Sequence, residues 1–269
     1  MKILSLNVNG LRAFYNRGKG DGWLLQDLID ENNPDVILFQ ETKCSPEDVA
    51  YWLQEWQEDW NIYAVSNEYI KGYAGVAAMI KKGSGLVPGL KEEFLSYKLI
   101  ESEYDTGRIV VLSNEEIAIV GVYVLNSGEK EELRIKWDKK FKSFLQKIQG
   151  NRKLIVLGDL NATTDEYDCY AFTQYFDNCP GVMSFEIDAL KSLMKDLQLT
   201  DSFRYMNKAE DYKYSWFSYR GNSRWNNQGF RLDYALVDDR LRSNIKVSDI
   251  LGSPCQFSDH SPILLELEI

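Results

Sequence analysis

The sequence lacks the features that mark several common protein classes. No apolar run approaches the ~18 residues that a membrane span requires, and the run after Met1 is too short for a signal peptide. Neither HExxH nor the P-loop pattern occurs, which disfavours a zinc protease and a P-loop NTPase. The cysteines form no CxxC pair, so we expect reduced thiols in a cytoplasmic protein without membrane contact; they are Cys44, Cys169, Cys179 and Cys255.

Basic residues are scarce relative to acidic ones. The 31 Lys and Arg against 41 Asp and Glu give a net charge of −10 and a pI near 4.8. This balance excludes a generally basic surface for nucleic acid but leaves room for a local basic site. With 269 residues, 44% of them hydrophobic, and no linker, repeat or low-complexity segment, we expect one domain over residues 1–269.

Histidine is the rarest side chain, because His260 is the only one. It follows Asp259 and precedes the final apolar run, Ile263 to Ile269. Imidazole suits proton transfer near neutral pH. From this stretch alone, two interpretations stay open: a functional group, or a loop histidine with a structural hydrogen bond.

Apolar runs and amphipathic stretches alternate along the chain, which predicts an α/β fold. We expect helices at 22–31, from Ser45 through Trp52 and Trp56, at 129–148 and at 185–197. We expect strands at 2–8, 35–41, near Tyr63, and at 75–80, 97–101, 108–112, 117–124, 153–157, 212–218, 231–237 and 263–269.

Many of these strands end in polar groups, and ligands of α/β folds gather outside strand ends. Polar residues end most strands, so the prediction of a shared site rests on the number and kind of these groups. They are Asn7 and Asn9, Glu41, Tyr123 and Asn126, Asp159 and Asn161, Asp233, Asp259 and His260.

Part of this set suits a divalent metal and a water molecule. Mg²⁺ is typically held by one or two carboxylates with water and phosphate. Glu41, Asp259 and the Asn9 carbonyl meet that need, and Asp159 with Asn161 lies on one short turn that can orient a water.

The remaining groups suit a phosphate. Asp233 can orient His260, as carboxylates orient imidazoles in hydrolases. Tyr123 and Asn126 offer donors to a phosphate oxygen. The combination indicates metal-assisted phosphodiester hydrolysis.

The window from Lys213 to Leu232 contains no acid and mixes basic with aromatic residues. Arginine for phosphate and aromatics for stacking are typical of nucleic-acid binding, which makes Arg220, Arg224, Trp216 and Phe230 candidate contacts. The alternative is an edge hairpin with snorkelling arginines. The stretch Lys136, Lys139, Lys140 and Lys142 is interpreted as a solvated helix face.

Several motifs resemble exonuclease III and the class II abasic-site endonucleases of the endonuclease/exonuclease/phosphatase superfamily. They include SLNVNGLR, LFQETK, GDLN, GFRLDY and SDHSP, and they lie at 5–12, 38–43, 72–77, 107–108, 123–128, 158–161, 201–204, 229–234 and 258–262. The resemblance spans nearly the whole length. It implies a DNase I-like, four-layer α/β sandwich of two mixed sheets flanked by helices.

The resemblance also implies a DNA-repair phosphodiesterase that depends on Mg²⁺ or Mn²⁺. Such enzymes cut 5′ to abasic sites and remove 3′ nucleotides or blocking groups, so double-stranded DNA that is damaged or has 3′ ends is the expected partner, and a monomer the expected state. The implied roles are Glu41 for the metal with Asn9 and Asp259 nearby, Asp159 with Asn161 for the water, His260 with Asp233 for the phosphate oxygen, Tyr123 and Asn126 for the scissile phosphate, and Asn7 for orienting neighbours. The general base stays open.

The chain departs from the family pattern in the loops expected to face DNA. Leu125 replaces a proline, and Thr164 replaces a histidine. The segment 170–179 is aromatic and lacks the lysine that the family carries there. We therefore expect a narrowed or shifted substrate preference, at ~1–3 kcal/mol per lost charged contact.

Two rival hypotheses remain. One is a phosphatase or phosphodiesterase of the same superfamily that acts on RNA or small phosphate esters. The other is a catalytically idle DNA-binding relative, which the retained Glu41, Asp159, Asp233, Asp259 and His260 disfavour.

Overall fold

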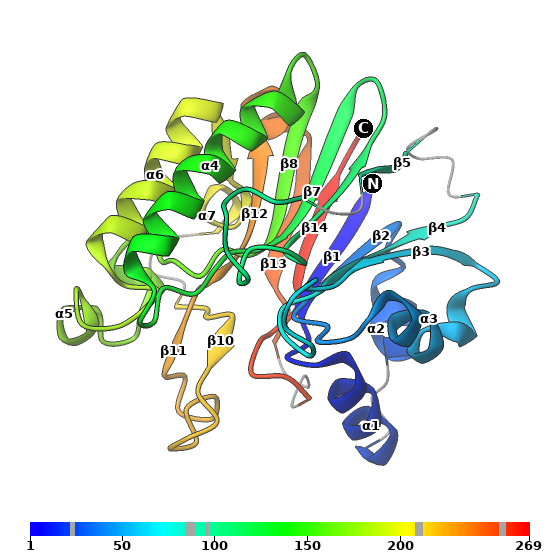
Figure 1. The fold of residues 1–269 in the computed structure, drawn as a ribbon, viewed down its shortest axis with the longest axis horizontal. Coiled ribbons are helices and arrows are strands. Elements are labelled where there is room, and N and C mark those ends of the chain that lie inside the picture. The colour runs from blue at the N-terminus through cyan, green and yellow to red at the C-terminus, as the bar shows by residue number, and fades with distance from the viewer. Residues whose placement is uncertain (22–24, 84–89, 95–96, 208–211, 253–256) are drawn as a thin grey trace.

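The computed structural model describes the chain apart from residues 22–24, 84–89, 95–96, 208–211 and 253–256 (Figure 1). Trp23 and Leu24, at the start of one expected helix, therefore lie outside the described residues, as does Cys255. The other three cysteines are free thiols, as expected. None of the helices in the described part of the chain has the length and apolar character of a membrane span.

Two six-stranded mixed sheets form the centre of the molecule. The first has the order β13 (Ile245–Ile250), β14 (Ile263–Leu267), β1 (Lys2–Asn7), β2 (Val36–Gln40), β4 (Val76–Lys81) and β3 (Trp60–Val65). The second has the order β5 (Lys91–Phe94), β6 (Ile109–Ser113), β7 (Ile117–Tyr123), β8 (Lys153–Asp159), β12 (Asp233–Asp238) and β9 (Leu199–Asp201).

The sheets pack face to face because their strands are apolar on both sides. Every residue of β2 and of β7 is buried, the pattern of strands covered on two faces. Side chains such as Leu38, Ile119 and Leu265 form the core between the sheets. This layer holds both sheets together as one body.

Helices cover the outer faces of the two sheets (Figure 1). On the second sheet, Trp137 of α4 (Glu131–Gln149) and Leu193 of α6 (Ser184–Leu197) pack in one cluster with Val156. Helices α1 (Leu11–Asp21), α2 (Leu25–Asn32) and α3 (Pro46–Trp52) cover the first sheet. The expected DNase I-like four-layer sandwich is confirmed.

The expected strand at 97–101 is wrong. The backbone amides of Leu99 and Ile100 donate to the Asp105 carboxylate at 2.5 and 2.8 Å, so they are not free to pair in a sheet. The edge strand next to β6 is β5 instead.

Short and edge elements are the other differences from expectation. Only Trp216–Phe217 of the expected strand at 212–218 is paired (β10, with β11 at Gly229–Phe230), and β9 and β13 were not expected. The remaining elements are α5 (Phe172–Tyr175), α7 (Ser202–Met206) and 3₁₀ turns at Gln54–Trp56, Glu166–Asp168 and Asp239–Asn244. The unexpected α1 begins directly after the first polar strand end.

The strand directions bring the polar strand ends to one edge. β1 runs parallel to β2, and β7 runs parallel to β8, so their carboxyl ends coincide within each sheet. β14 and β12 are antiparallel to β1 and β8, so the residues before them lie at the same edge. Within each sheet, the expected convergence therefore follows from topology.

Candidate active site

Asp159 lies at the centre of the site because of the register of the second sheet. It is opposite Tyr123 of β7 on one side and Asp233 of β12 on the other. Gly158 makes this register possible. Its φ is +138°, and an added Cβ would lie 2.0 Å from the Val122 carbonyl oxygen, so only glycine fits there.

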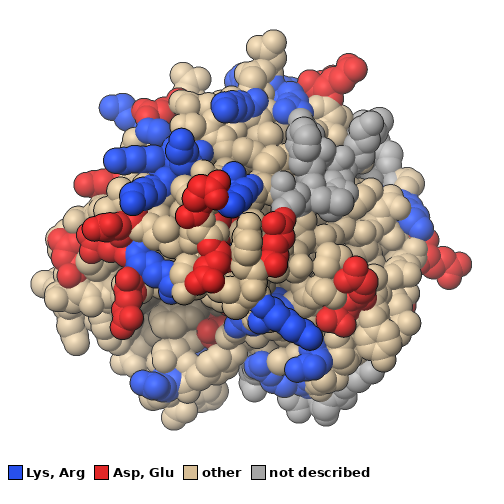
Figure 2. All heavy atoms as spheres, viewed as in Figure 1, with Lys and Arg blue, Asp and Glu red and all other residues tan. Residues whose placement is uncertain are grey.

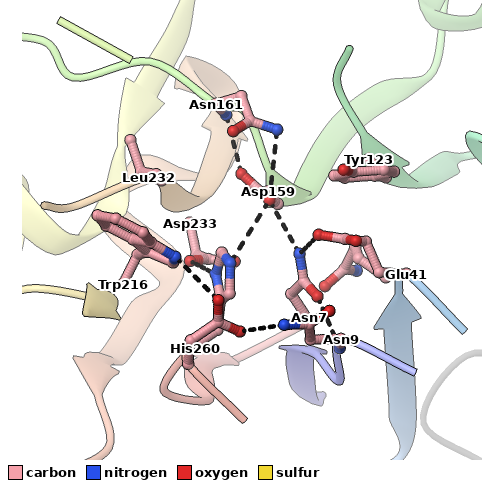
Figure 3. Close-up of polar contacts among 12 residues, drawn as sticks. Asn7, Asn9, Glu41, Tyr123, Asp159, Asn161, Trp216, Leu232, Asp233 and His260 are labelled. Carbon is pink, nitrogen blue, oxygen red and sulfur yellow. Dashed lines mark hydrogen bonds and ion pairs between the residues drawn. The ribbon is translucent and has the colours of Figure 1, made fainter. Parts of the chain in front are cut away.

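Asn7 links the two sheets through its side-chain amide. Its Nδ2 donates to Asp159 Oδ2 at 2.9 Å and to Glu41 Oε1 at 2.9 Å (Figure 3). Asp159 Oδ1 accepts the Asn161 backbone amide at 2.9 Å. Asn7 and Asp159 are almost fully buried, so these bonds fix the carboxylate in one orientation.

Burial also changes the acidity of Asp159. Removal from water, together with the nearby charges of Asp233 and Glu41, outweighs the lowering effect of His260 and raises the pKa of this carboxyl to about 8. The group therefore titrates near neutral pH, the range that suits general acid–base catalysis.

The imidazole of His260 is held by Asp233. Its Nδ1 lies 2.8 Å from Asp233 Oδ2, and its Nε2 lies 3.8 Å from Asp159 Oδ2. Burial alone would lower the pKa of His260, but the charge and hydrogen bond of Asp233 raise it to about 10. The ring is therefore a cation across neutral pH, with Nε2 facing the Asp159 side.

Glu41 and Asn9 begin loops with strained backbones on the opposite side of the site. Both have positive φ angles, 50° and 45°, which are uncommon for residues other than glycine. Asn9 Nδ2 donates to Asp259 Oδ1 at 3.0 Å, while Lys43 Nζ contacts both Asn9 Oδ1 and Glu41. Asn9, Glu41 and Asp259 are thus gathered as expected.

The donor set fits a divalent cation. Among the described residues, carboxylate oxygens of Glu41 and Asp159 and a ring nitrogen of His260 lie within 4.8 Å of one another. Because the His260 ring is protonated, the carboxylates are the candidate ligands. Carboxylate and amide oxygens dominate the neighbourhood, as Mg²⁺ and Mn²⁺ prefer. Glu41 belongs both to this group and to the group around Asn9, which makes it the central candidate ligand.

Tyr123 and Asn126 complete the site on the β7 side. Burial, and next the charge of Glu41, raise the pKa of Tyr123 well above its usual value, so its hydroxyl stays a donor. Asn126 Nδ2 donates to Asn161 Oδ1 at 3.1 Å. Both residues lie where the sequence predicted.

The four candidate DNA contacts from the window Lys213 to Leu232 lie in different environments. Trp216 reaches the site, since its Nε1 donates to Asp259 Oδ2 at 3.1 Å. Phe230 is only 4% exposed and packs behind Trp216. Arg224 donates to Ser261 Oγ at 2.6 Å, which braces the turn before β14. Arg220 is exposed on the hairpin between β10 and β11.

Sequence reasoning missed three cations that support the site. Arg108 is buried with its guanidinium 4.7 Å from the Tyr123 ring centre. Arg134 is buried on α4 and donates to the carbonyls of Leu160 and Asn161 at 3.1 Å each. Lys43 pairs with Glu41. The signal for Arg134 was present, because it lies three residues before the buried Trp137 on the same helix face.

The sandwich fold and the gathered carboxylates, amides and imidazole define a class of protein, the phosphodiester hydrolases with a DNase I-like fold. The model of the Endonuclease/Exonuclease/phosphatase family matches residues 4–260, and the chain belongs to this family.

Individual relatives give the same picture. The chain is 30% identical to an exodeoxyribonuclease of Bacillus subtilis, with all of both chains covered. An AP endonuclease structure from Leishmania major has a TM-score of 0.84 and 25% identity, covering 100% of this chain and 87% of that chain. The 3′ phosphatase NExo from Neisseria, solved with a product DNA hairpin, has a TM-score of 0.81 and 27% identity, with both chains fully covered.

Proposed function

We propose that this protein is a metal-dependent DNA-repair nuclease that cleaves beside abasic sites or removes groups from 3′ ends. The observation that carries the proposal is the buried arrangement of Asp159, Asp233 and His260 opposite Glu41. The relatives named above, an exodeoxyribonuclease, an AP endonuclease and a 3′ phosphatase, support DNA as the substrate class. Action as a cytoplasmic monomer is part of the proposal.

Glu41 is the proposed principal metal ligand, with Asn9 and Asp259 beside it. A bound Mg²⁺ or Mn²⁺ supplies neutralising charge to a phosphate oxygen. Asn7 keeps the Glu41 and Asp159 carboxylates at a fixed separation, since one amide nitrogen donates to both.

Asp159 is the proposed acceptor of the proton of the attacking water. Its carboxylate is oriented by Asn7 and by the Asn161 backbone, and its raised pKa matches it to proton transfer near neutral pH. Asn161 faces the same space with its side-chain carbonyl held by Asn126.

His260 is the proposed donor to the non-bridging oxygen that gains charge as the phosphate is attacked. The Asp233 carboxylate fixes the ring and keeps it protonated. Preorganised donors of this kind are typically worth ~10²–10³ in rate. Tyr123 and Asn126 are proposed to hold the same phosphate.

A groove beside Asn9 is the proposed track for one side of the DNA. It has a volume of about 760 Å³, and its lining includes the cations Arg12, Lys43 and Lys71 and the aromatic ring of Tyr73. On the other side of the site lies the β10–β11 hairpin, which carries Trp216 and Arg220. Local cations of this kind can bind phosphates even where, as in Figure 2, acidic and basic side chains are interspersed over the surface.

Two substitutions test the site assignment. Asp159→Asn removes the proposed proton acceptor, and His260→Asn removes the proposed phosphate donor. Each should lower cleavage of abasic or 3′-recessed duplex at least about 100-fold while circular dichroism and thermal unfolding show an intact fold. Glu131→Gln, on the exposed start of α4, is the matched control and should leave the rate unchanged. Full activity in either site variant refutes the assignment.

The rival substrate class is tested with the same proteins. A panel of abasic duplex, 3′-recessed duplex, RNA and small phosphate esters separates a DNA enzyme from a superfamily phosphatase. Greater efficiency on the esters than on any DNA would replace the proposal. Tight DNA binding without cleavage of any substrate would favour the idle relative.

A further inference from the structure

A buried ion pair between α4 and α6 lies behind two turns of the candidate active site. Arg134 of α4 is 2% exposed, and Glu186 of α6 is fully buried. Arg134 Nη1 lies 3.3 Å from Glu186 Oε1, and Arg134 Nε donates to the two oxygens of Asp138 at 2.8 and 2.9 Å. Burying charged groups is costly, and apolar side chains of similar size would join the helices as well. The pair therefore needs a reason beyond helix packing.

The guanidinium of Arg134 joins the ends of two neighbouring strands. Its Nη1 donates to the carbonyl of Leu125, after β7, at 2.7 Å and to that of Asn161, after β8, at 3.1 Å. Its Nη2 donates to the Leu160 carbonyl at 3.1 Å. The planar fork of an arginine can span several carbonyls in this way, whereas a lysine has a single nitrogen from which to reach them.

The two turns held by Arg134 carry side chains of the candidate active site. Asn126 Nδ2 donates to Asn161 Oδ1 at 3.1 Å, and Asn161 Nδ2 donates to the Val124 carbonyl at 2.9 Å. The Asn161 amide also orients the Asp159 carboxylate (Figure 3). Asn161 has a φ of +47°, a left-handed conformation that persists only where the surroundings hold it. The bond from Arg134 to the Asn161 carbonyl is part of that hold.

Glu186 ties a further segment to the same turns. Its Oε2 accepts the amide of Gly181 at 2.6 Å and that of Met183 at 3.2 Å. The Gly181 carbonyl in turn accepts the amide of Thr163, two residues after Asn161, at 2.7 Å. The Glu186 carboxylate thus offsets the buried guanidinium and fixes the chain that continues from the Asn161 turn.

We propose that Arg134, with Glu186 as its counter-ion, is a positioning residue that holds Asn126 and Asn161 in the arrangement needed to bind the phosphate and the attacking water. This inference rests on the proposed function. Arg134 is buried behind the turns, so it acts through them and not on the phosphate directly.

Arg134→Lys tests this role, because it keeps the positive charge and loses the planar fork. We expect kcat on the cleaved duplex to fall about 10-fold or more, since small displacements of groups around the reacting atoms are costly. Kd for the same duplex in EDTA, measured by fluorescence anisotropy, should stay within about twofold of the wild-type value, because the cations of the groove beside Asn9 are unchanged. An unchanged kcat in folded Arg134→Lys overturns the inference.

Leu145→Ala is the matched control for loss of stability. Leu145 is fully buried on the same helix, about three turns beyond Arg134, and its truncation leaves a cavity. This variant should have a lower Tm but a wild-type kcat at a temperature where circular dichroism shows it folded. Equal losses of kcat in the two folded variants would assign the effect to destabilisation and overturn the inference.

A variant without the buried charges covers the case in which Arg134→Lys does not fold. Arg134→Met combined with Glu186→Gln and Asp138→Asn removes the guanidinium together with both of its carboxylates, so no buried charge is left without a partner. It should fold and show the same loss of kcat as expected for Arg134→Lys. A wild-type kcat in this variant overturns the inference.

A double-mutant cycle shows whether Arg134 acts through the two turns. Asn126→Ala removes the side-chain bond to Asn161, so part of the arrangement that Arg134 holds is already lost. Arg134→Lys should therefore lower kcat by a smaller factor in the Asn126→Ala background than in the wild type. Equal factors in the two backgrounds would show independent effects and contradict the inference.

A measurement without cleavage separates this inference from the proposed function. The side-chain amide signals of Asn126 and Asn161 in proton–nitrogen correlation spectra should move in Arg134→Lys and stay in place in Leu145→Ala. If the wild type cleaves no DNA but the signals respond in this way, the proposed function fails and the positioning of the asparagines stands. If cleavage is normal but neither kcat nor the signals respond to Arg134→Lys, the reverse applies.

Discussion

At the scale of single residues, Asp233 determines the charge of the only histidine. Burial alone would favour the neutral ring of His260, and the Asp233 carboxylate reverses that balance. The same carboxylate accepts from the ring nitrogen that does not face Asp159, so it sets both charge and orientation. Asp233 thus provides both the protonation and the orientation of His260 that the proposed phosphate contact requires.

A pH profile tests this coupling. The protonated ring is the proposed donor, so on the alkaline side wild-type activity should be lost as the pH rises through the His260 pKa of about 10. On the acid side it should fall as Asp159, with a pKa of about 8, takes up a proton and no longer accepts one from the water. In Asp233→Asn the raising charge is gone while burial remains, so the His260 pKa falls and the alkaline limb of kcat/KM moves to lower pH. The rate at neutral pH should also fall about 100-fold or more. An alkaline limb at the same pH in both proteins would contradict the role of Asp233.

Much of the candidate site could be predicted at this scale, and the reason is local. Asp159 and Glu41 end apolar runs, so each appears in the sequence as an abrupt change from buried to polar. Arg108, directly before β6, and Arg134, within α4, do not end an apolar run, and charged residues at such positions are usually exposed. Their burial depends on carbonyls and rings supplied by distant parts of the chain.

At the scale of elements, a buried ion network fixes the start of β12. Asp168 lies in the 3₁₀ turn after β8, and its carboxylate binds Arg231 Nε at 2.6 Å and Arg204 Nη2 at 2.6 Å. Arg231 Nη1 also pairs with Asp201 at 2.7 Å. Since Arg231 lies two residues before Asp233, the network positions the strand that carries the histidine's partner.

The network makes stability sensitive to acid. Burial would raise the pKa of Asp168, but the neighbouring arginines, Arg231 first, hold it well below its usual range. Its contribution is therefore fully present above about pH 4, the value of an unfolded aspartate, and is lost as the pH falls below that. Asp168→Asn should lose about 3–5 kcal/mol of unfolding free energy at pH 7, because it leaves a buried arginine short of its partner.

Urea unfolding at pH 7 and below pH 4 measures both effects. The wild type should lose stability on acidification more steeply than Asp168→Asn. Asp196→Asn removes a carboxylate from an exposed pair with Lys142 and should change little. Equal acid sensitivity in wild type and Asp168→Asn would show that the network does not act as described.

The elements themselves were predictable where their pattern was long and regular. β8 and α4 follow from an apolar run and a helical stripe. β13 is an edge strand with a register shift near its start, and its buried and exposed residues do not alternate regularly; β9 has only three residues. Neither strand therefore gives a clear signal in the sequence. The length of the strand expected at 212–218 was overestimated because its aromatic residues favour strands, while only Trp216 and Phe217 pair.

At the scale of the whole molecule, the two sheets share one core, and we infer that residues 1–269 form one domain. The resemblance to a known family gave the sandwich, which composition and periodicity could not have given alone. It did not give the charge distribution. A body of net charge −10 must bind DNA through local cations that outweigh the repulsion from the rest of the surface.

Salt dependence tests that view of the surface. The logarithm of the DNA-binding constant should fall linearly with the logarithm of the salt concentration, with a slope of about −0.9 for each phosphate contacted. Lys71→Gln, in the groove beside Asn9, should weaken binding of all duplexes and make the slope shallower by about one such step. Binding that is unaffected by salt would exclude this groove as the phosphate track.

The central claim is metal-dependent cleavage of DNA by the edge where the two sheets meet. The most direct measurement is cleavage of a labelled duplex with one abasic-site analogue, and of an intact duplex with a recessed 3′ end, each with Mg²⁺ or Mn²⁺ and with EDTA. We predict incision 5′ to the lesion, removal of 3′ nucleotides, or both, only when metal is present, and loss of this activity in Glu41→Gln. Cleavage that persists in EDTA, or no cleavage of either duplex with metal, would contradict the account.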